Sequence, residues 1–169
     1  MNHLAQITVE LPGGRSCQIR CVRAPRGAEH LADVLVDIDL QSFVETTLSR
    51  PIAAAMLHHG EVFLLLADDD VIGAATCTRT WDPPDEAVLL TMGLRPGWRG
   101  RGLGQRFVVW VMEGLGAEGL VALNLLVGSD NVRALGLYRE LGFTLVGEGP
   151  LDATSGERLL ALRVPLESP

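Results

Sequence analysis

A short run rich in glycine and arginine, Arg99-Gly100-Arg101-Gly102-Leu103-Gly104, has the residue types of a pyrophosphate-binding turn. Glycines let the backbone approach a ligand closely, and the first N–H groups of a helix that begins here lack internal acceptors. The helix macrodipole adds partial positive charge, and the nearby Arg95 and Arg106 add to the full charges of the run. The run therefore predicts an anion site, although a tight turn without a ligand would have the same composition.

The identity of the anion follows from what the run lacks. A dinucleotide turn has the pattern Gly-x-Gly-x-x-Gly, whereas the pattern here is Arg-x-x-Gly-x-Gly, and Asn124 stands where the dinucleotide site needs an acid. A nucleoside triphosphate loop needs a lysine, but all fourteen basic residues of the chain are arginines. Both nucleotide hypotheses are therefore disfavoured against coenzyme A.

The elements that must position this run follow from hydrophobic periodicity and turn residues. Helices are predicted over residues 29–38, 40–58, 102–117 and 131–141, with a break near Asp39 between the first two and strain at Pro51 within the second. Strands are predicted over residues 7–11, 17–22, 62–67, 71–78, 87–94, 121–127, 144–148 and 158–164. This order indicates an α/β sheet with helices on both faces.

A second run stands one predicted helix and one predicted strand after the first. It reads Asn131-x-x-Ala134-x-x-Leu137-Tyr138-x-x-x-Gly142-Phe143. With both runs in this order, the chain resembles the GCN5-related N-acetyltransferase (GNAT) superfamily, whose coenzyme A turn and following strand–helix motif they match. The close resemblance covers about residues 87–148, and the order of elements extends it loosely to residues 17–166. We therefore expect one domain over residues 1–169, in which residues 1–16 form an N-terminal extension.

The resemblance implies a fold and a cofactor site. The fold would be a mixed, mostly antiparallel twisted sheet in which a splayed parallel strand pair forms a slot for acetyl-coenzyme A. Gly93 is where we expect the bulge that starts the splay, and exposed backbone there would pair with the pantetheine arm and polarise the thioester carbonyl. For Asn131, a plain N-cap role has equal standing, and both roles can hold together. The cofactor residues implied are Met92, Gly93, Leu94, Arg99, Gly100, Arg101, Gly102, Leu103, Gly104 and Asn131.

The resemblance also implies catalytic roles. Tyr138, the only tyrosine, would protonate or hydrogen-bond the departing thiolate of coenzyme A, although a buried aromatic side chain is the plainer alternative. Many relatives carry a glutamate where this chain has Val88, so Glu86 is the nearest substitute for the base that takes the amine proton. A solvated loop end is the alternative for Glu86. His58 and His59 could also serve, but they are expected at the exposed end of a helix before Gly60.

Two functions compete on these grounds. The first is an N-acetyltransferase that moves the acetyl group from acetyl-coenzyme A directly to a primary amine of a small molecule or peptide. No cysteine lies in the second half of the chain, which disfavours an acetyl-cysteine intermediate built there. The second is a non-catalytic sensor of acyl-coenzyme A with the same fold, for which the missing strand carboxylate leaves room.

Composition sets the remaining expectations. Hydrophobic residues make up 47% and charged residues 21% of 169 residues, a globular balance without a membrane span or an export signal, so we expect a cytoplasmic protein. Residues 29–86 hold twelve carboxylates against two arginines, which disfavours nucleic acid and mildly favours a cationic acceptor. Three cysteines without paired spacing predict buried thiols and no metal site. The oligomeric state stays open, with a homodimer as one option.

Overall fold

The computed structural model describes residues 2–42, 48–152 and 155–167. These residues form eight β-strands, mostly in antiparallel pairs, together with one parallel pair and four α-helices. The predicted mixed, mostly antiparallel α/β fold is therefore confirmed. The chain divides into two compact units, one of residues 1–78 with 91–111 and the other of residues 79–90 with 112–169.

The first unit begins with four antiparallel strands in the order β1-β2-β3-β4. They are β1 (Asn2–Glu10), β2 (Ser16–Arg23), β3 (Glu61–Ala67) and β4 (Asp70–Arg79). The first two form a hairpin paired from Asn2↔Arg23 to Glu10↔Ser16. Residues 2–10 thus add a strand to the sheet, and their status as an extension of a single domain stays a prediction.

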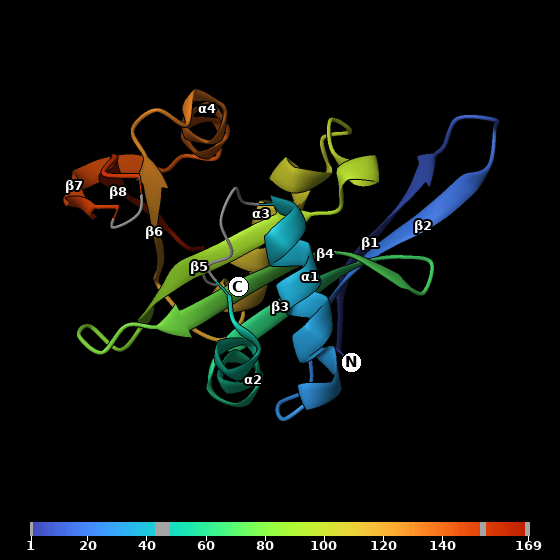
Figure 1. Ribbon diagram of the computed structural model, residues 1–169, viewed down its shortest axis with the longest axis horizontal. Helices are drawn as coiled ribbons and strands as arrows, with labels where there is room; N and C mark the ends of the chain where they lie inside the picture. Colours follow the sequence, from blue (N-terminus) through green and yellow to red (C-terminus); the bar gives the residue numbers. More distant parts are fainter. Residues whose placement is uncertain (1, 43–47, 153–154, 168–169) are drawn as a thin grey trace. The chain divides into compact units, whose positions relative to one another are not determined.

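Two helices follow the hairpin, and they lie in front of β3 and β4 in Figure 1. A single 3₁₀ turn (Glu29–Leu31) leads into α1 (Ala32–Ser42), and α2 covers Arg50–His59. Their apolar side chains pack with those of β2, β3 and β4 into one buried core, since Leu35, Ile38, Leu57 and Leu64 are all at most 2% exposed.

The predicted break near Asp39 is wrong, because α1 continues to Ser42. Asp39 is only 3% exposed, and its carboxylate accepts a hydrogen bond of 3.0 Å from the N–H of Leu48. The polar residue suggested the end of a helix, but it lies within the helix, and its buried side chain is hydrogen-bonded to a residue that follows the helix. Nor is Pro51 a source of strain, because it stands in the first turn of α2, where its missing N–H costs nothing.

β5 (Glu86–Leu94) and α3 (Leu103–Gly116) each pass from one unit into the other. In the second unit, β6 (Ala122–Gly128) pairs in parallel with the start of β5, from Glu86↔Ala122 to Leu89↔Leu125. β8 (Arg158–Pro165) pairs antiparallel with both β6 and β7 (Thr144–Leu151). The expected parallel pair is therefore present, and α4 (Val132–Glu140) connects β6 to β7.

The cysteines and one tryptophan lie in the interior of the protein. Cys17, Cys21 and Cys77 are all buried free thiols, as predicted. Trp110 is 6% exposed and also belongs to the core. Across the part of the chain that the structure describes, no helix is both long and apolar enough to cross a membrane.

Candidate functional site

The glycine-rich turn has the backbone conformation that only glycine adopts easily. A 3₁₀ turn, η2 (Pro96–Trp98), ends β5, and α3 begins at Leu103. Between them, Gly100 has φ +74° and Gly102 has φ +72°, both in the left-handed region. A Cβ added to either glycine would have no atom within 4 Å. The front of the turn is therefore open, with room for a ligand beside the backbone.

The N–H groups that lead into α3 have no acceptor among the residues that the structure describes. Among the described residues, none accepts a hydrogen bond from the N–H groups of residues 100–105, and the first α3 bond runs from Arg106 N–H to the oxygen of Gly102 at 3.3 Å. Several donors in a row at a helix N-terminus form a concave anion site, strengthened by the helix macrodipole. We call residues 100–105 the cradle. Their N–H groups can donate to an anion.

Two of the neighbouring arginines are committed elsewhere. Arg99 donates through Nε to the carbonyl of Leu94 at 2.8 Å and through Nη2 to the carbonyl of Gln41 at the end of α1. Its own N–H donates to Pro96 at 3.2 Å. Arg95 pairs with Asp37 of α1 at 2.6 Å. In this conformation both guanidinium groups bind residues of α1. They therefore do not supply the positive charge that the sequence predicts at the anion site.

The end of β5 also packs closely on α1. A Cβ on Gly93 would lie 2.1 Å from Ser42 Oγ and 3.1 Å from Ile38 Cγ2. Close approach of the helix is thus a reason for glycine at this position, whereas the expected bulge stays a prediction. Met92 is half-buried, and Leu94 is buried with 8% exposure.

Two predicted site residues lie in the second unit, one directly before α4 and one within it. Asn131 is the N-cap, since its side-chain oxygen accepts the N–H of Ala134 at 3.1 Å. Its exposed side-chain NH₂ group has no partner among the described residues and could still bind a ligand. Tyr138 is half-buried, and its ring meets Phe143 edge to face with centroids 5.2 Å apart. This contact fixes the ring that carries the hydroxyl.

Glu86, the other predicted catalytic residue, is not a solvated loop end. It opens β5, and its side chain is 13% exposed. Arg163 donates to Oε1 at 2.7 Å, and Asn124 donates to Oε2 at 2.7 Å. These hydrogen bonds, first from Arg163 and then from Asn124, lower the pKa of Glu86. The carboxylate therefore stays ionised at neutral pH and is a weaker base than an ordinary glutamate.

Sequence reasoning assigned no role beside Glu86 to Arg163 or Asn124. The three residues lie on neighbouring strands, because Val88 pairs with Asn124 and Asn124 pairs with Arg163. Side chains alternate between the two faces along each strand, but this alternation alone does not say which residues of neighbouring strands are adjacent. The register of β5, β6 and β8 is needed to bring these three together on one face.

The remaining base candidates lie in the first unit. His58 and His59 end α2 before Gly60, as predicted. His58 Nε2 lies 2.7 Å from Glu29, and this contact lowers the pKa of the Glu29 carboxyl group. His58 is therefore engaged in an exposed contact with Glu29 at the surface.

Several known sequences that resemble this chain are named as acetyltransferases. Mycothiol acetyltransferase of Beutenbergia cavernae is 30% identical over 155 residues, which are 84% of this chain and 49% of that protein. The ribosomal protein bS18-alanine N-acetyltransferase of Salmonella typhimurium is 35% identical over 80 residues, 47% of this chain and 53% of that protein. The chain therefore spans about half the length of these curated relatives.

The fold also has solved counterparts. The ribosomal-protein-S18-alanine N-acetyltransferase of Escherichia coli superimposes with a TM-score of 0.75 over 88% of this chain and 96% of its own, at 20% identity. At that identity the likeness concerns the fold alone. The sequence model of the Acetyltransferase (GNAT) family matches residues 29–143, which include the cradle, Glu86 and Tyr138. The chain therefore belongs to the GNAT family of acetyltransferases.

Proposed function

We propose that the protein is an N-acetyltransferase that moves the acetyl group of acetyl-coenzyme A directly to a primary amine of a small molecule or peptide. The observation that carries this proposal is the cradle, with its unpaired N–H groups behind two left-handed glycines. Membership of the GNAT family supports coenzyme A as the ligand of the cradle. The names of the sequence relatives support acetyl transfer as the chemistry.

The residues present fit coenzyme A. The backbone of residues 100–105 offers donors to a pyrophosphate, and the open space beside Gly100 and Gly102 leaves room for it. We further propose that the backbone of Met92, Gly93 and Leu94 binds the pantetheine arm and that the Asn131 amide binds the cofactor. When bound, acetyl-coenzyme A supplies an activated thioester, and the chain has to orient it and manage two protons.

Tyr138 is the proposed acid. As the amine nitrogen bonds to the acetyl carbon, the carbon–sulfur bond breaks and the thiolate leaves with the electron pair. The Tyr138 hydroxyl donates its proton to that sulfur and later regains a proton from solvent. Glu86 is the proposed acceptor of the amine proton through water. Because its pKa is lowered, Glu86 is a weak base in that role. Its pair with Arg163 then acts mainly through its charges.

Direct transfer is favoured over an acetyl-enzyme. All three thiols are buried, and burial raises the pKa of Cys77, so this sulfur is not a ready nucleophile. An amine can therefore attack the thioester without a covalent relay through cysteine.

The acceptor class follows from charge and from the relatives. Residues 29–86 carry a net charge of −10, from twelve carboxylates and two arginines, and this acidic balance along the sequence favours a cationic acceptor. One relative is named for mycothiol and another for the alanine of a ribosomal protein. We propose a cationic small molecule or peptide amine as acceptor.

A sensor of acyl-coenzyme A without turnover is the second candidate. The observation that favours it is the carboxylate of Glu86, which is held by Arg163 and Asn124 and not presented as a strong base. Such a protein would keep the cradle and bind the cofactor tightly.

One experiment separates the two candidates. Thiol release from acetyl-coenzyme A is followed with a panel of amines that includes polyamines, aminoglycosides, amino acids and N-terminal peptides, and coenzyme A binding is measured in parallel. Thiol release that depends on one class of amine establishes the enzyme. Tight coenzyme A binding without release for any amine establishes the sensor, and absence of both refutes the cofactor assignment.

A further inference from the structure

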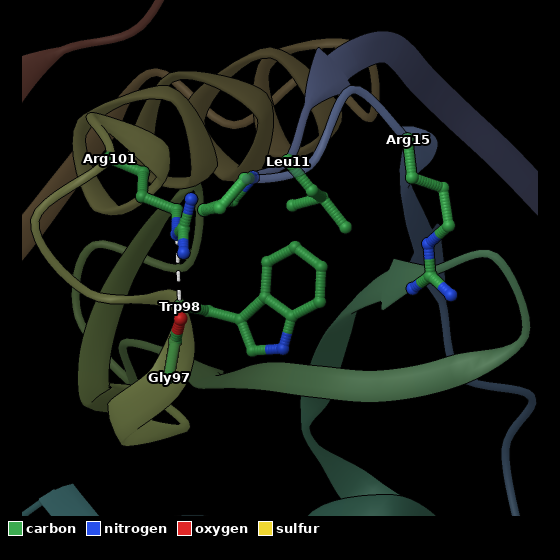
Figure 2. Close-up of a pocket in the computed structure, with 6 residues that line it drawn as sticks. Leu11, Arg15, Gly97, Trp98 and Arg101 are labelled. Carbon is green, nitrogen blue, oxygen red and sulfur yellow. Dashed lines mark hydrogen bonds between the residues drawn. The ribbon is translucent and has the colours of Figure 1, made fainter.

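A hollow of about 500 Å³ lies beside the cradle in the first unit, and no step of the proposed reaction uses it. It lies between the turn of the β1–β2 hairpin and the η2 segment. Its lining residues are Leu11, Pro12, Arg15, Gly97, Trp98 and Arg101. Figure 2 shows the Trp98 indole in the hollow, with Arg101 and Arg15 on opposite sides of it in this view.

Two exposed arginines give the hollow positive charge. Neither Arg15 nor Arg101 has a carboxylate partner among the described residues. Arg101 Nε makes only a long hydrogen bond of 3.4 Å to the carbonyl of Gly97. Other arginines of the same unit, such as Arg20 and Arg50, are paired with Asp69 and Asp33. Two unneutralised guanidinium groups on one hollow favour a ligand with a phosphate or carboxylate.

The remaining wall is apolar and flat. Trp98 is half-buried and presents its indole beside the Leu11 side chain (Figure 2). An indole face stacks well on a planar ring such as a nucleobase, and guanidinium groups at its sides bind the attached anion. The lining thus combines the two chemistries of a nucleotide: a ring and a phosphate.

The hollow and the cradle share one residue, Arg101. The N–H of Arg101 belongs to the cradle, whereas its side chain lines the hollow. A ligand whose pyrophosphate lies on the cradle can therefore reach the hollow with its next group. We infer that the hollow binds a phosphate-bearing nucleoside, either the 3′-phosphoadenosine end of coenzyme A or a separate nucleotide. The first source rests on the proposed function.

The test is calorimetric titration of the full chain with three probes: coenzyme A, 3′-dephospho-coenzyme A and adenosine 3′,5′-bisphosphate. Arg15→Gln removes one guanidinium from the hollow and touches no residue of the cradle. Arg50→Gln is the matched control, because it removes the same charge from an exposed ion pair outside the hollow. Melting curves check that both variants are folded.

We expect the parent and Arg50→Gln to bind coenzyme A about tenfold more tightly than the dephospho form, the effect of one charge-assisted hydrogen bond. Arg15→Gln should bind the two forms equally. If the parent does not distinguish them but binds adenosine 3′,5′-bisphosphate alongside saturating coenzyme A, and Arg15→Gln loses that binding, the source is a separate nucleotide.

Two results would overturn the inference. One is Arg15→Gln matching the parent with all three probes, and the other is a parent protein that shows neither preference nor bisphosphate binding. A failure of the proposed function looks different, because coenzyme A would then bind no variant while bisphosphate binding still depends on Arg15. As a second readout, bisphosphate should change the tryptophan fluorescence of the parent but not of Trp98→Phe.

Discussion

Replacing Gly102 by alanine, beside a control at another glycine, should distinguish a loss of stability caused by backbone strain from a loss of coenzyme A binding. Gly102 has φ +72°, and a Cβ there meets no atom within 4 Å, so the methyl group finds space but the backbone is disfavoured. Gly119 offers a matched control, because it has φ +81°, an equally open Cβ position and no part in the cradle. The two substitutions should therefore strain the fold alike and differ only in ligand binding.

The expected strain can be worked from the backbone angle. An L-residue in the left-handed region costs about 1–2 kcal/mol. For a chain of this length each kcal/mol lowers the melting temperature by roughly 2–4 °C, so both variants should melt about 2–8 °C below the parent.

The effect on binding should belong to Gly102→Ala alone. Its methyl group would stand among the unpaired N–H groups of residues 100–105. Loss of one hydrogen bond to a charged phosphate costs about 1.5–3 kcal/mol, which is about 10- to 150-fold in affinity. Calorimetry with coenzyme A measures this loss beside the melting curves. Equal affinity in the parent, Gly102→Ala and Gly119→Ala would refute the cradle as the pyrophosphate site.

Three further outcomes are expected. Tyr138→Phe should lower turnover by about 10²- to 10⁴-fold in thiol-release assays and change coenzyme A affinity by less than about tenfold; full turnover would exclude the hydroxyl as the acid. Gly93→Ala should cost about 1–3 kcal/mol in urea unfolding, because its Cβ would lie 2.1 Å from Ser42 Oγ, and Ser42→Gly should restore part of the loss; strictly additive effects would contradict this contact. Because Arg163 lowers the pKa of Glu86 below its ordinary 4.5, this carboxylate stabilises the fold above that value and loses the effect as pH falls through the lowered pKa. Between about pH 6 and about pH 3, the free energy of unfolding should fall less steeply in Glu86→Gln than in the parent. Identical slopes in the two proteins would rule out the pair of Glu86 and Arg163 as a source of stability.

The sequence by itself determined the features that depend on neighbouring residues. The left-handed glycines, the helix that starts at Leu103 and the Asn131 cap all rest on interactions within a few positions of the chain. The spacing of the two motif runs also sufficed for the family, because their order along the chain is itself a local pattern.

Only the tertiary structure decided where the long side chains go. The Arg99 guanidinium reaches the end of α1, and Arg163 reaches Glu86 from a strand 77 positions away. Arg15 and Trp98 come to one hollow from segments far apart in sequence. The long side chain of an arginine has many rotamers of similar free energy. Which partner it reaches is therefore set by strand register and helix packing. Those are non-local contacts, which hydrophobic period and turn chemistry do not specify.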